Sequence, residues 1–466
     1  MTAYKILDDK VVFALGTPSG WTAATLQQGI DVARSNGLAL FIRPGTYDTG
    51  DLYIDSSSGT NPIAMEAVPG SVIIRYTGGT DFFAITGVSD CVIRGISFDR
   101  NNISQGGWAA AILVRNASRT LIENCRIFNG PQRGLYMVNC GTRQTVGGSG
   151  SNEILSSAGR IVGCEIFDCD VALFSFGNVA LRVESNTIHN CSNNGVLIWQ
   201  DSPLLDGSSV IDNSITDIKA DAGGTGENGN AISVYNANGC NVVSNRIRFC
   251  KFTAVRANAS SNTVIANNNI YAMAETAIWA EETGTGDGQT NVGTVISGNV
   301  INICRDGISA TNFASKGRLA TITGNVVRNA TAGSGIFVEG DSVINANVVE
   351  CMHQFGLVLG TNSFTRNLIA SDNMLRNCAA GVAISSSSAA GYVLVTDNMI
   401  QMPSGVSTDY GIVTYTFTGT SRVIDDTMSG ITPSTYPRIK LGMNVVHDLQ
   451  TPDPIPTSCV TTMPSF

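Results

Sequence analysis

Short runs in which apolar and polar residues alternate recur along most of this chain. One kind of run precedes an asparagine, as in Leu181–Glu184 and Thr294–Ser297. A second kind begins with Gly or Ala, as in Gly195–Ile198 and Gly335–Val338. Alternation over three to five residues, with many β-branched side chains and with Gly or Asn between the runs, predicts β-strands and not helices.

The runs belong to one repeat, and its most regular feature is the sequence motif Asn-x-(Ile/Val/Leu/Met). Successive copies begin 22 to 32 residues apart, at Asn186, Asn213, Asn245, Asn268, Asn299, Asn325, Asn347, Asn373 and Asn398. Earlier in the chain, Cys125 and Cys164 occupy the same position of the motif. A constant motif at variable spacing indicates a solenoid whose turns differ in length from one repeat to the next.

Three strand-like runs per repeat predict an all-β, right-handed parallel β-helix, a single-stranded solenoid in which like residues stack on like. The recurring asparagines would then form a ladder, each side-chain amide bonding the next at the rung spacing of about 4.8 Å. Asparagine also tolerates the left-handed backbone conformation that a sharp corner needs. A structural role is therefore expected for these asparagines, and not a catalytic one.

The cysteines follow the same repeat. Five residues after the ladder position stand Cys169, Cys191, Cys250, Cys304 and Cys378, and in other repeats Ile218, Met273, Ala330 and Met352. A position shared by Cys, Ile, Met and Ala is typical of a buried apolar site. These thiols are expected to be free and buried, not disulfide-bonded or bound to metal.

Residues 21–37 depart from the strand pattern. Leu26, Ile30, Val32 and Ala33 have helical spacing, and Gly37 is a plausible stop. The spacing predicts a short capping helix over the first rung, where an uncapped solenoid would expose core and unpaired backbone. The expected organisation is residues 1–50 as N-terminal cap and first strands, 51–448 as β-helix, and 449–466 as an extended Pro-rich tail.

Composition narrows the choice of partners. The net charge of −9 provides no basic surface for a phosphate backbone, so no nucleic-acid binding is expected. No apolar run is long enough to span a membrane, and the first ten residues lack the basic and apolar regions of an export signal. The motifs HExxH and GxSxG and a P-loop are absent, and the three histidines are scattered, so neither metal nor cofactor is expected.

The predicted helix and the following segment FIRPGTY resemble the start of pectate-lyase-like β-helices, a pattern shared with phage tailspikes. Residues 229–270 and the segment GISATNFASKGRLATITGNVVRNA resemble a bacterial family of twin-arginine-translocated β-helix repeat proteins of unassigned function. That likeness runs from Asn186 to about Asp448, and members of that family begin with an export signal that this chain lacks. The resemblance implies the fold, but it supplies no catalytic residues.

Alternation places every second residue of the Gly- or Ala-opened strand on the outside. This outer column mixes aromatic, amide and charged side chains, as a sugar-binding face requires. The candidate binding residues are Trp199, Tyr235, Arg256, Asn258 and Trp279. The alternative is that the aromatic side chains pack under long turns or against a neighbouring subunit.

Two carboxylates of the same column, Glu281 and Glu339, are the catalytic candidates. They are expected two rungs apart, about 9–10 Å, close to the separation of an inverting glycosidase pair. The other acids of the region are expected to be solvated turn residues, namely Asp201, Asp206, Asp221, Glu227, Glu282, Asp287 and Asp341. Insertions after Asp201, Ile218 and Glu282 are the expected walls of a groove.

Three functions fit these observations. The first is a tailspike-type virion component that recognises a bacterial surface polysaccharide, with or without cleaving it, and that forms a homotrimer or joins a larger virion assembly. The second is a secreted or periplasmic glycoside hydrolase or polysaccharide lyase. The third is a purely structural, adhesive solenoid. The first places the protein on the virion tail, and the second in the periplasm or outside the cell.

Overall fold

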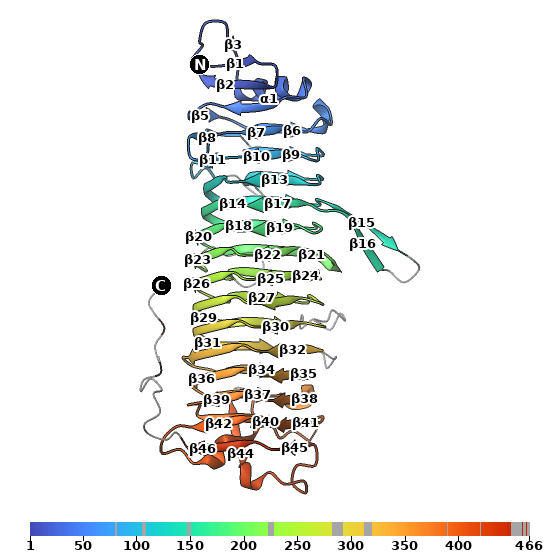
Figure 1. Cartoon of the computed structure of the whole chain (residues 1–466), viewed down its shortest axis with the longest axis vertical. Coiled ribbons are helices and arrows are strands. Elements are labelled where there is room, and N and C mark those ends of the chain that lie inside the picture. The colour runs from blue at the N-terminus through green and yellow to red at the C-terminus, as the bar shows by residue number, and fades with distance from the viewer. Residues whose placement is uncertain are drawn as a thin grey trace. The chain divides into compact units, whose positions relative to one another are not determined.

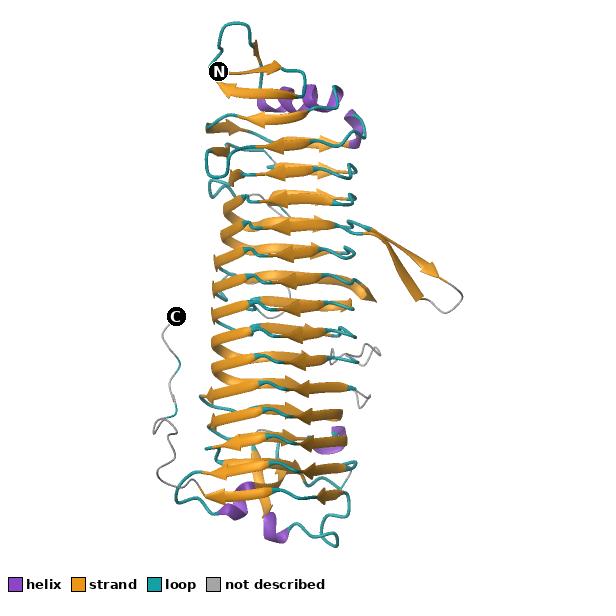
Figure 2. Ribbon diagram, in the orientation of Figure 1, coloured by secondary structure: helices purple, strands orange, loops and turns teal. Residues whose placement is uncertain are grey.

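The computed structural model describes residues 1–79, 82–104, 109–146, 151–221, 228–281, 292–311, 319–388, 390–419, 421–448, 459 and 463. The chain divides into two compact units, Met1–Ile232 (unit 1) and Ser233–Phe466 (unit 2). Each unit is a stack of parallel rungs built almost wholly from strands, as Figures 1 and 2 show. The predicted parallel β-helix is confirmed.

The rungs of unit 1 are built from three kinds of strand segment. Before the ladder position lie β4 (Ala39–Ile42), β7 (Ala64–Glu66), β10 (Val92–Arg94), β13 (Thr120–Glu123), β17 (Gly159–Val162), β19 (Arg182–Glu184) and β22 (Ser209–Ile211). After it lie β5 (Gly45–Thr49), β8 (Val72–Tyr76), β11 (Ile96–Asp99), β14 (Arg126–Val138), β18 (Glu165–Phe176), β20 (Thr187–Cys191) and β23 (Ser214–Ile218). The third segment is formed by β6 (Leu52–Asp55), β9 (Phe83–Thr86), β12 (Ala110–Arg115), the second halves of β14 and β18, and β21 (Asn194–Leu205).

Unit 2 repeats this plan, and β24 (Ile232–Asn238) crosses the boundary between the units. The first segments are β25 (Asn241–Val243), β28 (Val264–Ala266), β30 (Val295–Ser297), β32 (Ala320–Thr323), β35 (Gly340–Asn345), β38 (Arg366–Ser371), β41 (Val393–Thr396) and β45 (Ile439–Leu441). The second segments are β26 (Arg246–Cys250), β29 (Asn269–Glu281), β31 (Val300–Ala310), β33 (Val326–Ala330), β36 (Val348–Met352), β39 (Met374–Arg376), β42 (Met399–Met402) and β46 (Val445–Asp448). The third segments are β27 (Val255–Asn258), the second halves of β29 and β31, β34 (Ile336–Val338), β37 (Phe355–Leu359), β40 (Ala380–Ser385) and β43 (Ile412–Phe417).

The asparagine ladder is present in both units. In unit 1 the amide Nδ2 of Asn186 donates to Oδ1 of Asn213 at 3.0 Å. In unit 2 the same bond, at 2.9–3.0 Å, links Asn245 through every later ladder asparagine to Asn398, and a further one joins Asn398 to Asn444. The ladder asparagines from Asn186 to Asn398 are at most 1% exposed. The expected structural role is confirmed.

The residue that adopts the left-handed conformation at each corner is not the ladder asparagine. Positive φ angles occur at the residue before the ladder asparagine, for example at Ser185 (54°), Asn267 (56°) and Gly298 (63°), and not at the ladder residue itself. The ladder asparagines have no positive φ, and their buried side chains reach the next rung. The residue before each of them therefore makes the turn, and Gly or a small polar residue fits there.

The five cysteines of the shared position are free and at most 3% exposed. Burial raises the pKa of the Cys169 thiol and of the Cys378 thiol to about 12, so neither forms a thiolate near neutrality. The prediction of buried, reduced thiols is confirmed. One disulfide exists elsewhere among the described residues, between Cys351 and Cys459.

The predicted capping helix is α1 (Leu26–Ser35). Thr25 and Gln28 form a capping box at its start, and Gly37 follows its end with a φ of 65°. Leu26, Ile30 and Ala33 are buried. The cap also contains β1 (Thr2–Ile6), β2 (Lys10–Leu15) and β3 (Thr22–Ala23), with β1 antiparallel to both of the others.

Several elements leave the regular rungs. The hairpin of β15 (Thr142–Val146) and β16 (Ser151–Ser156) projects from the rungs of unit 1 (Figure 2). In unit 2, β44 (Arg422–Thr427) pairs antiparallel with β43. Short 3₁₀ turns are η1 (Ser56–Ser58), η2 (Asn362–Phe364), η3 (Thr408–Gly411) and η4 (Met428–Gly430).

Among the described residues, no helix is long and apolar enough to cross a membrane.

Candidate functional site

The outer column of unit 2 has the register that the alternation predicts. Arg256 pairs with Trp279, Trp279 with Ser309, and Ser309 with Phe337. The residues between them, such as Ala257, Ile278 and Ala280, are at most 1% exposed and fill the core. The parallel ladder therefore holds these outward side chains one above another along a single face.

Four of the candidate residues form one cluster on β27 and β29. The Nε of Arg256 donates to Oε1 of Glu281 at 2.5 Å, and Asn258 Nδ2 donates to the same oxygen at 3.2 Å. The Arg256 guanidinium lies 5.1 Å from the ring centroid of Trp279. The side chain of Glu281 is 6% exposed and that of Arg256 is 12% exposed, so this ion pair is largely removed from water.

Next to this cluster, Trp279 and Glu339 line a pocket of about 430 Å³, here called the Trp279 pocket. The indole Nε1 donates to Oγ1 of Thr311 at 3.2 Å, which fixes the ring plane on the pocket wall. The lining combines aromatic, hydroxyl and charged side chains, namely Thr276, Trp279, Asp306, Ile308, Ser309, Thr311, Ser334, Phe337, Glu339, Thr361, Asn362, Phe364, Phe417 and Arg422.

Internal hydrogen bonds engage Thr311 and Asp306 of this lining, but they leave part of it without a partner. The hydroxyl oxygen of Ser334 is buried and has no hydrogen-bond partner within the described part of the chain. Buried hydroxyl groups without a partner are costly, and a polar ligand would supply one. The arrangement of flat rings and available hydroxyl groups suits a sugar ring with its hydroxyl substituents.

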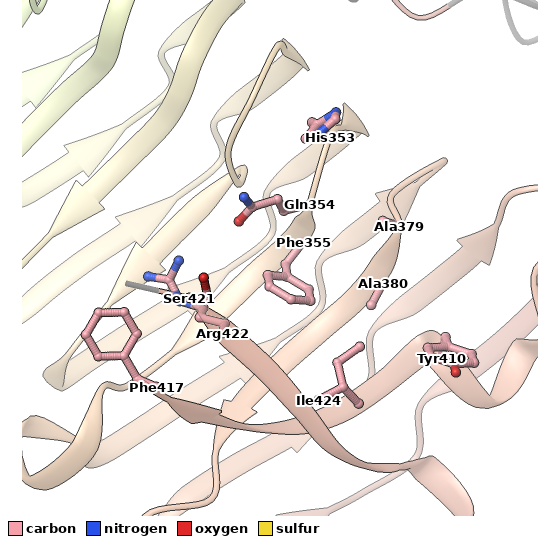
Figure 3. Close-up of a pocket in the computed structure, with 10 residues that line it drawn as sticks. All are labelled: His353, Gln354, Phe355, Ala379, Ala380, Tyr410, Phe417, Ser421, Arg422 and Ile424. Atoms are coloured by element: carbon pink, nitrogen blue, oxygen red, sulfur yellow. The ribbon is translucent and has the colours of Figure 1, made fainter. Parts of the chain in front are cut away.

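A second pocket of about 430 Å³, the His353 pocket, lies on the other flank of the β43–β44 hairpin. Figure 3 shows its residues: His353, Gln354 and Phe355 come from the turn and start of β37, and Phe417, Ser421 and Arg422 come from the hairpin. Phe417 and Arg422 line both pockets. The tip of the β43–β44 hairpin therefore lies between the Trp279 pocket and the His353 pocket on the outer face of unit 2.

Three aromatic rings surround Arg422. Its guanidinium carbon lies 4.8 Å from the ring centroid of Phe337, 5.7 Å from that of Tyr415 and 5.9 Å from that of Phe417. Tyr415 is buried, its hydroxyl donates to the Gly360 carbonyl, and burial raises its pKa. These contacts hold the hairpin tip against the outer face of the rungs.

The remaining two binding candidates lie elsewhere. Trp199 is on β21 of unit 1, half-buried, and meets Phe174 edge-on at 6.3 Å. It packs against a cluster of outward but buried side chains that includes Leu113, Tyr136, Phe174 and Leu197. Tyr235 is half-buried on β24 and does not line either pocket. The structure brings together Arg256, Asn258, Trp279, Glu281 and Glu339, all in unit 2.

Two of the acids expected in solvated turns are not solvated turn residues. Asp341 lies on β35, where its side chain is 18% exposed and pairs with Arg366. The other is Asp206. It is fully buried, and its carboxylate accepts hydrogen bonds from Gln200 Nε2 at 2.7 Å and from the Ser208 N–H at 3.0 Å. Burial raises its pKa. Glu227, Glu282 and Asp287, with most of the insertions expected to wall a groove, lie outside the described residues. Within the described ranges, no group of three or more His, Cys, Asp or Glu residues could hold a metal ion.

Sequence reasoning missed Phe364, Phe417 and Arg422. A signal for the last two was present: Phe417-Thr-Gly-Thr-Ser-Arg422 separates two β-branched runs, Ile412–Tyr415 and Arg422–Ile424. Such a pattern is typical of a hairpin, which breaks the parallel plan. What the pattern does not give is where the hairpin tip lies relative to earlier rungs.

Comparison with known proteins supports the architecture. Residues 59–215 match the model of the right handed beta helix region, and no curated protein matches the chain. The parallel rungs and this match define the class: the chain is a right-handed parallel β-helix protein.

Several solved structures are similar at low identity. The Dettilon tailspike protein (gp208) is 14% identical with a TM-score of 0.42, and the match covers 91% of this chain and 66% of that one. PfbA, a surface adhesin of Streptococcus pneumoniae, is 13% identical with a TM-score of 0.43, covering 89% and 93%. A protein of Geobacillus virus E2, ORF18, is 13% identical with a TM-score of 0.41, covering 64% of this chain and 56% of its own. At these values, the likenesses carry no argument about function.

Proposed function

We propose that this protein binds a bacterial surface polysaccharide through the outer face of unit 2. The observation that carries the proposal is the Trp279 pocket, in which Trp279, Phe337 and Phe417 stand beside the hydroxyl groups of Ser309, Thr311, Ser334 and Thr361. Aromatic faces stack on the apolar face of a pyranose ring, while hydroxyl groups and a carboxylate bond its substituents. The neighbouring cluster of Arg256, Asn258 and Glu281 extends the polar surface along the same face.

The finer role that we propose is that of a tailspike-type attachment component of a virion tail, released outside the cell with the particle. This role rests on the resemblance of residues 21–47 to the start of tailspike β-helices. The same resemblance implies a homotrimer or a larger virion assembly. Light scattering of the purified chain tests the association, and a monodisperse monomer would contradict it.

A polysaccharide hydrolase, secreted or periplasmic, is the second candidate, because Glu339 lines the same pocket as Trp279. Its supposed partner, Glu281, is held by Arg256 and Asn258, and this arrangement favours a binding or structural role over proton transfer. We therefore propose recognition without cleavage. Glycan incubated with the protein should show no new reducing ends, and Glu339→Gln should leave that result unchanged. Reducing ends that disappear in Glu339→Gln would establish the hydrolase.

The decisive variant for binding is Trp279→Ala. Loss of the indole should weaken glycan binding by about 1–2 kcal/mol, the size of a good aromatic contact. Stability should change little, because the ring faces the pocket and not the core. Affinity is measured by calorimetry against bacterial surface glycans, with thermal unfolding as the control for folding. If Trp279→Ala unfolds the protein but leaves the affinity of the folded fraction intact, the column is a packing surface and the proposal fails.

A further inference from the structure

Arg422 is a half-buried cation whose guanidinium forms no ion pair among the described residues, although the Glu339 carboxylate lines one of the pockets that it borders. Other arginines on this part of unit 2 have carboxylate partners: Arg256 pairs with Glu281, Arg328 with Glu350, and Arg366 with Asp341. No ion pair within the described ranges includes Arg422, and its buried Nε has no hydrogen-bond partner there. Three rings lie against the guanidinium. Cation–π contacts of this kind use the flat faces of the group and leave the in-plane N–H donors to other acceptors.

The two pockets on either side of Arg422 differ in charge. The Trp279 pocket contains the carboxylates of Asp306 and Glu339. The lining of the His353 pocket contains no Asp or Glu, and it has Arg422 and His353 as its basic side chains. An anionic group is therefore repelled from the first pocket and attracted into the second.

The rest of the His353 pocket offers neutral contacts to a sugar. Phe355 and Phe417 provide aromatic surface, and Gln354 and Tyr410 provide an amide and a hydroxyl group. Figure 3 shows Arg422 on the hairpin facing the turn that bears Gln354. The pocket thus combines a single strong anion-binding group with the stacking and hydrogen-bonding groups of a glycan subsite.

We propose that the His353 pocket binds an acidic sugar residue, whose carboxylate forms a bidentate pair with Arg422, while a neutral residue of the same chain occupies the Trp279 pocket. The inference rests on the proposed polysaccharide binding and narrows its ligand to an acidic polysaccharide. A protein of net charge −9 needs a local cation of this kind to accept a polyanion. The matching geometry of guanidinium and carboxylate also explains why an arginine suits this position.

The test is a glycan array on which hexuronate-containing oligosaccharides stand beside their carboxyl-reduced, neutral counterparts, followed by calorimetry on the pairs that bind. The native protein should bind one or more hexuronate glycans about tenfold more tightly than the reduced counterparts. Arg422→Gln should reduce this preference to about twofold or less. Trp279→Ala should weaken both members of a pair by a similar factor and leave the preference intact.

Two controls separate the site from general charge and from folding. Arg246→Gln removes one positive charge from an exposed position outside both pockets and should leave the preference unchanged. Arg422→Lys retains the charge but lacks the guanidinium fork, so it should keep binding with a smaller preference. If Arg422→Gln does not fold, as judged by thermal unfolding, Arg422→Lys and the salt dependence of the native preference decide the question.

The outcomes that overturn the inference are distinct from those that overturn the proposed function. Equal binding of hexuronate and carboxyl-reduced glycans, or a preference that survives in Arg422→Gln, overturns the acidic-sugar site and leaves polysaccharide binding standing. A stronger preference for sulfated or phosphorylated glycans overturns the assignment to a carboxylate. A folded protein that binds no glycan on the array overturns both.

Discussion

Each ladder asparagine satisfies several buried groups at once. The amide of Asn325 donates to Oδ1 of Asn347 at 2.9 Å and to the Ile296 carbonyl at 3.0 Å. Its Oδ1 accepts from the backbone N–H and from Nδ2 of Asn299. Water cannot replace these bonds because the ladder is buried. A ladder position therefore requires a short side chain that is both donor and acceptor, which explains the recurrence of asparagine.

Replacing Asn325 by alanine should lower the free energy of unfolding by about 1–3 kcal/mol, because donors and acceptors on two neighbouring rungs lose their partner. Denaturant unfolding followed by circular dichroism measures the change. Asn269→Ala is the matched control, since Asn269 is exposed on β29, and it should change stability by less than about 0.5 kcal/mol. Equal effects of the two substitutions would show that the ladder adds no stability.

At the scale of elements, equivalent strands of different rungs present different outer faces. In unit 1 the outward Leu113, Tyr136, Phe174 and Leu197 stack in register and are at most 5% exposed. In unit 2 the corresponding strands present Arg256, Trp279 and Phe337, and the β43–β44 hairpin covers only part of that face. The backbone repeat is the same in both cases. The covering turns and hairpins make one face a packing surface and the other a pair of pockets.

The ion pair between β27 and β29 provides a test at this scale. Glu281→Ala should destabilise unit 2 by about 3–5 kcal/mol, because it leaves the Arg256 guanidinium buried without its counter-charge. The double variant Arg256→Met with Glu281→Leu should recover most of the loss. Thermal unfolding of the variants measures both effects.

The more exposed pair Arg126–Glu165 is the control, with side chains 45% and 35% exposed. Glu165→Ala should cost about 1 kcal/mol or less, because water screens the remaining charge. If Glu281→Ala costs no more than Glu165→Ala, the Arg256–Glu281 pair is not part of the framework of the site.

At the scale of the whole chain, a disulfide joins segments that the repeat does not relate. Cys351 lies on β36, and Cys459 lies 108 residues later in the segment predicted as a Pro-rich tail. Asn377 donates from Nδ2 to Sγ of Cys459 at 3.0 Å. The bond fixes one point of that segment beside the rungs of unit 2, whereas the other ten cysteines are buried and free.

Closing a loop of this length should stabilise unit 2 by about 2–4 kcal/mol, mainly by restricting the unfolded chain. Cys459→Ser should therefore lower the thermal midpoint of the native protein. The same substitution should have no effect in the presence of a reductant that cleaves the bond in both proteins. Identical midpoints without reductant would show that the cross-link does not stabilise the fold.

The amino-acid sequence by itself determined the rungs, the ladder, the buried cysteine position and the capping helix. Each depends on local spacing, and stacking of identical positions turns that spacing into contacts. Only the tertiary structure decided which outward residues are covered. Asp206 is buried, Trp199 packs on Phe174, and Arg422 reaches Phe337 across several rungs. The pairing of Cys351 with Cys459 is of the same kind. The physical reason is that alternation fixes the direction of a side chain, whereas turns of variable length, which follow no period, decide what lies over it.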